Sequence, residues 1–216
     1  MDDRGRQEVR VLVFAASLRE DSTNSRLARI AATALELLGA TIDYATMREF
    51  DSPSYDQDVE DSEGIPAGAA ELRRRLEAAD AFVIASPEYN AAMPGMLKNS
   101  IDWASPFRPQ PFNGRHCMLL SASPSMVGGN RGLWSLRVPL EHLGARVYPD
   151  MFSLAQAPAQ LTADGQLASQ EVHERLVTTL SSFLDIVEAT RHYPCARKAW
   201  VEFLGEQPSP ATSRAE

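Results

Sequence analysis

Short apolar runs alternate with segments of helical periodicity along this chain, and this alternation constrains its fold most strongly. The strand-like runs are residues 9–15, 41–44, 81–85, 117–121 and 146–148. Between them, apolar residues recur at steps of three and four, as on one face of a helix. Such a β-α series predicts a parallel sheet covered by helices on both faces. We therefore predict a doubly wound α/β fold with five strands in the order 2-1-3-4-5.

The helical segments have recognisable ends. Gly39 follows the first apolar period and is expected to stop that helix. Pro94 is expected in the first turn of another helix, and Pro139 is expected to kink or end a third. The expected helices cover residues 27–38, 69–79, 94–105, 133–140 and 171–190, with a further short one at 199–204.

Length and composition indicate one domain. The chain has 216 residues; we assign residues 1–192 to a single domain and 193–216 to an extension that is expected to be disordered from about residue 206. No apolar run approaches the length of a membrane-spanning helix, and the start lacks the features of a signal peptide. We therefore expect a cytoplasmic protein that does not bind membranes. The net charge of −8 disfavours nucleic acid as a partner.

Residue patterns typical of metal or thiol chemistry are missing from the sequence. Cys117 and Cys195 give neither a disulfide framework nor a zinc cluster, and the four histidines show no pairing pattern. The acidic segment 49–63 does not match a calcium loop, so we interpret it as solvated loop. We expect no metal site.

Three loops are expected to carry the function, because ligands bind outside the carboxyl ends of the strands where the strand order reverses. The first loop (residues 17–25) is rich in hydroxyls and amides and ends at a helix start, which favours an anion such as a phosphate monoester. The alternative is an ordinary helix cap made by Asn24 or Ser22. The loop lacks the glycine patterns of P-loop and dinucleotide sites. By composition alone, the second loop (87–93) is better explained as a connector than as a site. The adjacent glycines of the third loop (123–130) allow its backbone to approach a ligand closely, and a flexible connector explains them equally well.

Together, however, three blocks in order resemble the NADPH-dependent FMN reductase family, whose flavodoxin-like members include quinone, chromate and azo-dye reductases. Residues 16–24 (ASLREDSTN) resemble the G-S-x-R-x-x-S-x-N phosphate loop of that family. Residues 87–105 (PEYNAAMPGMLKNSIDWAS) resemble its P-E-Y-N…P-G…L-K-N-A-I-D-W-x-S block, which is the specific one. Residues 123–143 (SPSMVGGNRGLWSLRVPLEHL) resemble its S-P-G…G-G-x-R block.

The resemblance implies roles for individual residues. The side chains that match ligands of the FMN phosphate are Ser17, Arg19, Ser22 and Asn24. The positions that match the loop against the isoalloxazine ring are Pro87, Glu88, Tyr89 and Asn90. Ser123 and Gly128 match the loop at the other edge of the ring. Ala16, Ala91 and Ser125 depart from the family pattern without removing a side-chain phosphate ligand.

The resemblance also implies a reaction. We expect an FMN-dependent NAD(P)H oxidoreductase in which NADPH or NADH gives a hydride to FMN. The electrons then pass to an acceptor such as a quinone, a free flavin, an azo compound or a metal oxyanion. Because the cofactor carries this chemistry, the resemblance implies no catalytic acid or base, and we assign none. The alternatives are a flavodoxin-type electron carrier or flavin-binding regulator, and a domain that has lost FMN and serves in assembly. Family members are commonly homodimers or homotetramers, so apolar residues of 94–105 face either a subunit partner or the core.

Overall fold

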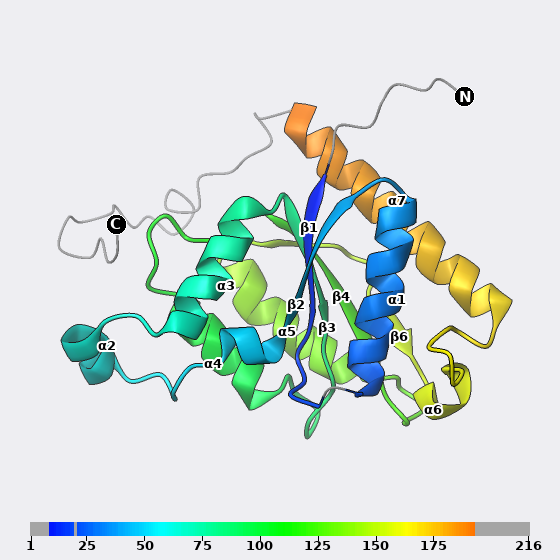
Figure 1. Cartoon of the computed structure of the whole chain (residues 1–216), viewed down its shortest axis with the longest axis horizontal. Helices are drawn as coiled ribbons and strands as arrows, with labels where there is room; N and C mark the ends of the chain where they lie inside the picture. The colour runs from blue at the N-terminus through cyan, green and yellow to red at the C-terminus, as the bar shows by residue number, and fades with distance from the viewer. Residues whose placement is uncertain (1–8, 20, 193–216) are drawn as a thin grey trace.

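The computed structural model describes residues 9–19 and 21–192, and its centre is a parallel sheet (Figure 1). The strand order β2-β1-β3-β4-β5 confirms the predicted topology. The strands are β1 (Arg10–Ala15), β2 (Thr41–Thr46), β3 (Ala81–Ala85), β4 (His116–Ala122), β5 (Arg146–Val147) and β6 (Phe152–Leu154). The chain therefore has the flavodoxin-like architecture that the alternation of runs predicted.

The predicted fifth strand is shorter than expected and is followed by a sixth. β5 pairs with the start of β4, and β6 pairs with its end, so the two segments occupy successive parts of one sheet edge. Pro149 lies between them and has no amide hydrogen to donate to β4. The edge strand is interrupted at this point and resumes at Phe152.

Helices cover both faces of the sheet (Figure 1). α1 (Thr23–Leu37) and α7 (Gln170–His192) pack on one face, where they bury Val11 and Val13 of β1. α3 (Ala67–Ala78), α4 (Gly95–Ala104) and α5 (Asn130–His142) contribute to the core on the other face, which takes Leu12 and Phe14. Because successive strand side chains point to opposite faces, β1 supplies both cores.

Several expected element boundaries were wrong. Segment 49–63 is not a plain loop: it contains the end of the 3₁₀ turn η1 (Met47–Phe50) and the helix α2 (Gln57–Glu63). The side chain of Asp56 accepts a hydrogen bond from the amide of Asp58 and so caps α2. Pro94 is the residue before α4 rather than in its first turn. Pro139 lies inside α5, so of its two expected effects, a kink or an end, the structure rules out the end.

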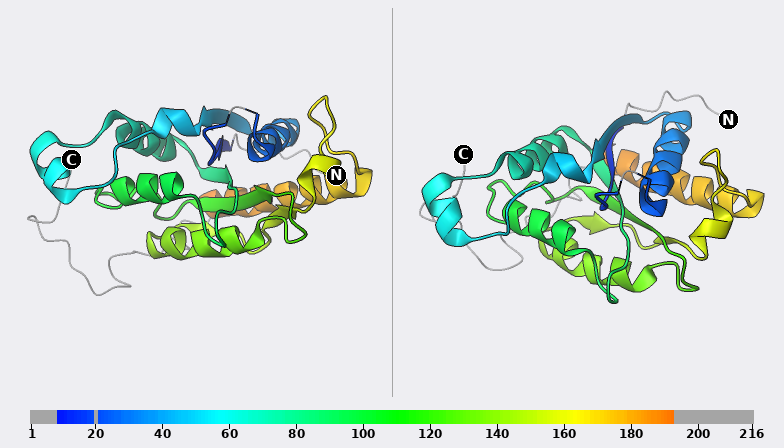
Figure 2. Two further views of the ribbon diagram at one scale, coloured as in Figure 1. Left: turned by 90° about the horizontal axis from the view of Figure 1, so that it is seen from below. Right: turned by 60° about the horizontal axis from the view of Figure 1, so that its bottom comes forward.

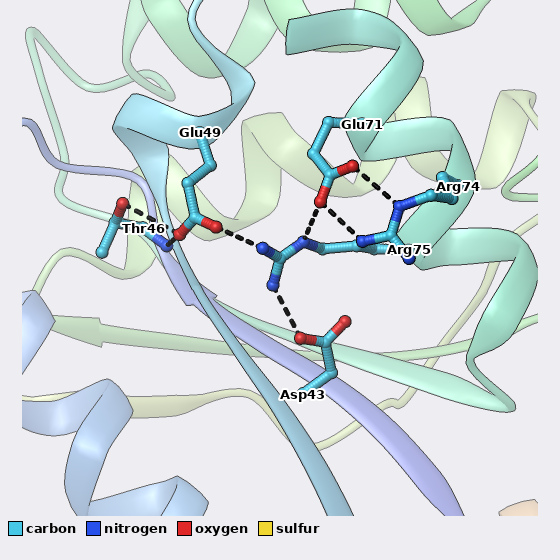
Figure 3. A network of polar contacts seen from close by, with 6 residues as sticks. All are labelled: Asp43, Thr46, Glu49, Glu71, Arg74 and Arg75. Carbon is cyan, nitrogen blue, oxygen red and sulfur yellow. Dashed lines mark hydrogen bonds and ion pairs between the residues drawn. The ribbon is translucent and has the colours of Figure 1, made fainter.

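An ion-pair network fastens the chain after β2 to α3 (Figure 3). The guanidinium of Arg75 donates to Asp43 (2.6 Å) and Glu71 (2.7 Å) and also pairs with Glu49. Glu49 in turn accepts the amide hydrogen of Thr46 at 2.7 Å. These contacts fix the position of η1 beside the carboxyl end of β2.

Some features of the sequence fall outside the described residues. They are the expected helix 199–204, the expected disorder from about residue 206, and Cys195. Cys117 is fully buried in β4, and burial raises the pKa of its thiol. Within 9–19 and 21–192, no helix is long and apolar enough to cross a bilayer. Over the same ranges, no group of three histidine, cysteine or acidic side chains is placed to hold a metal ion.

Candidate FMN site

The three loops meet at the carboxyl ends of β1, β3 and β4, as the topology predicted. This edge lies at the bottom of Figure 1 and comes forward in the right-hand view of Figure 2. The amide of Ala16 donates to the carbonyl of Ala85 (2.9 Å), which joins the start of the first loop to the end of β3. The amide of Ser86 donates to the carbonyl of Leu120 (2.8 Å), which joins the second loop to β4.

Ser22 is the N-cap of α1. Its hydroxyl oxygen accepts the amide hydrogen of Ser25 at 3.0 Å and lies 2.8 Å from the Ser25 hydroxyl oxygen. The helix-cap alternative therefore describes Ser22. The other amides of the first turn, at Thr23 and Asn24, have no intrahelical acceptor, because a helix leaves its first N–H groups without one.

Asn24 fastens the first loop to the end of β4. Its side-chain nitrogen donates to the carbonyl of Ala122, and its side-chain oxygen accepts the Ala122 amide hydrogen, both at 2.9 Å. The side chain is 3% exposed. The hydroxyl of Thr23 donates to the same carbonyl at 3.2 Å. The polar groups of Asn24 thus face the protein backbone rather than an open cleft.

A cationic cleft of about 260 Å³ borders the first loop. Arg19, Arg29 and Arg48 line it together with Ser17 and Ser25, and the described part of the lining contains no carboxylate. The guanidinium of Arg48 donates to the carbonyl of Leu18 at 3.1 Å and so braces the loop from η1. In a chain of net charge −8, three arginines around one cleft favour an anionic ligand group.

The sequence motif did not point to Arg29 or Arg48. Arg29 lies one turn beyond the matched loop in α1, and Arg48 follows β2. Only the fold brings these two side chains beside Arg19. Arg29 lies four residues after Ser25 and therefore on the same face of α1. This spacing is the sequence feature that could have placed Arg29 at the site.

The second loop turns back on itself in a two-residue hairpin. Tyr89 and Ala92 exchange backbone hydrogen bonds of 2.9 and 3.0 Å. Asn90 and Ala91 between them have φ angles of +52° and +63°. This left-handed conformation is accessible to asparagine but strained for alanine. Tyr89 and Asn90 are exposed, and Pro87 is half-buried, so the hairpin presents its backbone and the Tyr89 ring at the rim of the site.

Glu88 holds the second loop against α5. Its carboxylate pairs with the guanidinium of Arg131 at 2.7 Å and accepts the amide hydrogen of Gly132 at 3.2 Å. The side chain of Glu88 is 10% exposed. A carboxylate near the first turn of a helix also interacts favourably with the helix dipole. Glu88 is therefore a positioning residue, with its carboxylate directed to α5.

The third loop is packed closely against its neighbours. Gly128 and Gly129 have φ angles of +62° and +84°. A Cβ on Gly129 would lie 2.0 Å from the Ser121 hydroxyl oxygen, and one on Gly128 would lie 2.9 Å from the Ala155 nitrogen. Ser123 donates its amide hydrogen to Leu154 at 3.1 Å, which fixes the start of the loop on β6. The two adjacent glycines therefore allow the third loop to pack closely against Ser121 and Ala155, and the loop is not a flexible connector.

Two residues of the specific motif act on a segment far from it in sequence. Asn99 of α4 donates to the carbonyls of Ser52 (3.1 Å) and Pro53 (2.9 Å) and accepts the Tyr55 amide hydrogen at 2.8 Å. The indole of Trp103 also donates to the Pro53 carbonyl at 2.7 Å. Asn99 and Trp103 therefore hold the segment between η1 and α2 against α4 by hydrogen bonds to its backbone.

These features define a flavodoxin-like protein whose arginine-lined cleft and first helical turn suit a phosphate group. The family model for NADPH-dependent FMN reductase matches residues 9–159. The chain belongs to this family. It is an FMN-dependent oxidoreductase that takes electrons from a nicotinamide cofactor.

Known proteins of similar sequence and structure agree with this assignment. The chain is 30% identical over 188 residues to the quinone reductase of Escherichia coli, covering 86% of this chain and 98% of that protein. It is 33% identical over 177 residues to an NAD(P)H-dependent FMN reductase of Pseudomonas aeruginosa, covering 81% and 93%. The structure of the flavoenzyme NAD(P)H:(acceptor) oxidoreductase FerB of Paracoccus denitrificans superposes with a TM-score of 0.73 at 28% identity, covering 84% and 98%.

Proposed function

We propose that Ser17, Arg19 and the first amides of α1 hold the FMN phosphate, with Arg29 and Arg48 adding positive charge. The cationic cleft beside the first loop supports this assignment most directly. A charge-assisted hydrogen bond to phosphate is stronger than a neutral one, so Arg19 is the side chain expected to matter most. Ser22 and Asn24 then act by shaping the loop, since their side chains are already bonded to Ser25 and Ala122.

We propose that the isoalloxazine ring lies between the second and third loops. Pro87, Tyr89 and Asn90 would contact it from the hairpin, while Glu88 fixes that hairpin from behind. Ser123 and Gly128 would flank the other edge. When bound, FMN supplies a ring that accepts a hydride from NADPH or NADH and passes the electrons on.

We propose a small quinone as the electron acceptor, because a quinone is the acceptor named for the Escherichia coli relative. The protein contributes binding and orientation, because the flavin ring itself carries the hydride and electron transfer. We also propose that residues 1–192 form the FMN-binding domain, that the chain acts in the cytoplasm, and that it assembles as a homodimer or homotetramer.

Anaerobic absorbance spectra of the FMN-loaded protein test the function. Addition of NADPH, and separately of NADH, is expected to bleach the flavin within seconds, and a quinone is expected to restore the oxidised spectrum. The faster donor identifies the preferred nicotinamide. Bound flavin that stays oxidised with both donors would instead indicate an electron carrier. A protein that retains no flavin would contradict the site.

A further inference from the structure

A second cavity lies beside the first loop, on the face of the sheet that carries α1 and α7. Its volume is about 700 Å³, and its walls are α1, the start of α7 and the hairpin of residues 161–167. In the left-hand view of Figure 2 this hairpin stands beside α1. We call this space the α1 cavity. Its size suits a small-molecule ligand.

The α1 cavity adjoins the candidate FMN site on two sides. Arg29 lines both this cavity and the cationic cleft at the first loop. On the other side, the guanidinium of Arg26 donates to the carbonyl of Thr162 in the hairpin. The hairpin follows α6 (Ala157–Gln160), whose first amide donates to the Ser123 carbonyl of the third loop at 3.0 Å. The wall of the cavity is therefore continuous with both the first and the third loop.

The chemistry of this wall changes along α1. Arg26 and Arg29 lie in the first two turns of the helix, next to the first loop. Ile30 and Leu37 follow toward its end and form an apolar wall, with Val177 of α7 on the other side of the cavity. At a rise of about 1.5 Å per residue, Arg26 and Leu37 lie about 16 Å apart along the helix axis. The cavity thus offers guanidinium groups next to the flavin site and apolar surface away from it.

Polar side chains on the hairpin and on α7 complete the cavity. Asp164 and Gln166 line it from the hairpin, and His173 lines it from the first turn of α7. A carboxylate accepts hydrogen bonds from ribose hydroxyls, whereas an amide and an imidazole can donate and accept, as the edge of adenine does. Asp21 also lines the cavity, so two carboxylates balance the two guanidinium groups in the described lining. The order of the groups, rather than a net charge, therefore identifies the ligand.

We propose that the α1 cavity binds the adenosine diphosphate half of the nicotinamide donor. The inference rests on the proposed position of the flavin ring between the second and third loops. In NADH and NADPH, the nicotinamide that lies on this ring is followed by a diphosphate and then by adenosine. The cavity presents its groups in the same order, with Arg26 for the diphosphate and the apolar wall and hairpin for the adenosine. A guanidinium has five N–H donors, so Arg26 can bind a phosphate while it keeps its bond to Thr162.

Stopped-flow reduction of the FMN-loaded protein by three donors tests the cavity. The donors are NADPH, NADH and reduced nicotinamide mononucleotide, which has the same nicotinamide but no adenosine. The dependence of the rate on donor concentration gives a dissociation constant for each. We expect the wild-type protein to bind the mononucleotide about tenfold more weakly than the two dinucleotides, because it cannot fill the cavity. Adenosine 5′-monophosphate is expected to compete with the dinucleotides and not with the mononucleotide.

Two variants of the cavity and one control locate the effect. Thr33→Glu places a carboxylate between Arg29 and Leu37, and it is expected to weaken NADPH and NADH about tenfold by repelling the diphosphate. Arg26→Gln removes a charge-assisted donor and is expected to weaken both by about the same factor. Both variants are expected to bind the mononucleotide like the wild type. Thr178→Glu is the matched control, because Thr178 is an exposed threonine of α7 outside the lining, and it is expected to leave all three donors unchanged. Thermal melts and flavin spectra show that each variant keeps its fold and its FMN.

Two results would overturn the proposal while the flavin chemistry stands. If Thr33→Glu and Arg26→Gln bind NADPH as tightly as the wild type, the adenosine lies elsewhere. If the wild-type protein binds the mononucleotide as tightly as NADPH, the adenosine contributes no affinity and the cavity has no role. A wild-type flavin that none of the three donors reduces is a different failure: it refutes the proposed function, and the assignment of the cavity with it.

Discussion

Replacing Asn24 by alanine distinguishes two roles of this side chain: contact with the FMN phosphate, or attachment of the first loop to β4. In the structure its side chain makes two hydrogen bonds to Ala122, each 2.9 Å long and buried. Two neutral hydrogen bonds contribute about 1 kcal/mol each, and the Ala122 amide left unpaired adds about 1–3 kcal/mol. The Ala122 carbonyl still accepts a hydrogen bond from the Thr23 hydroxyl, so removing its Asn24 donor costs less free energy.

We therefore expect Asn24→Ala to lower the unfolding free energy of the FMN-free protein by about 2–4 kcal/mol. Urea unfolding followed by circular dichroism measures this change. Arg19→Ala is the comparison: Arg19 is exposed, so its loss is expected to change stability by less than about 0.5 kcal/mol. The same change is expected to weaken FMN binding by about 1.5–3 kcal/mol, roughly 10- to 150-fold, in a fluorescence titration.

One combination of results would refute the assigned role of Asn24. If Asn24→Ala leaves the FMN-free protein as stable as the wild type while FMN binding falls as far as in Arg19→Ala, then Asn24 contacts the phosphate. The hydrogen bonds to Ala122 would then not describe its role.

Three further changes probe the site and its support. Ala91→Gly is expected to stabilise the protein by about 0.5–1 kcal/mol, because glycine relieves the left-handed strain of the hairpin; a lower melting temperature would contradict it. Gly129→Ala is expected to lower the unfolding free energy by about 3 kcal/mol, because its Cβ would overlap the Ser121 hydroxyl oxygen. An unchanged melting temperature would be inconsistent with that packing. Burial lowers the pKa of His116 from 6.5 to about 4, so the unfolded chain takes up a proton at a higher pH than the folded one. Stability should therefore fall as the pH drops from 6.5 to 4, by up to about 1.4 kcal/mol per pH unit, and urea melts of His116→Gln should lack this component.

The sequence predicted the topology well because the signals are local. The apolar runs and helical periods lie within short windows, and their alternation predicts a parallel sheet. The order 2-1-3-4-5 is a common one for a doubly wound sheet of five strands. The division of the edge strand into β5 and β6 depends on how the chain around Pro149 meets β4, which no local period records. α2 was missed because it is a seven-residue helix, stabilised by its Asp56 cap rather than by an apolar face.

The candidate site was predictable in place but not in the role of each residue. The three loops were located by the strand order alone. Ser22 and Asn24 are residue types that suit a phosphate and a helix start equally well. The partner that fixes Asn24 lies 98 residues away in sequence, so only the folded chain distinguishes the two roles. Arg48 likewise lines the cleft only in the folded chain, because the end of β2 lies beside the first loop.

The bonds between the three loops have a thermodynamic consequence for the cofactor. Asn24 ties the first loop to β4, and Glu88 ties the second loop to the start of α5. A ligand that enters loops already ordered loses less conformational entropy than one that must order them. More of the interaction energy with FMN therefore remains as affinity, and the empty and loaded proteins should share one backbone conformation at these loops.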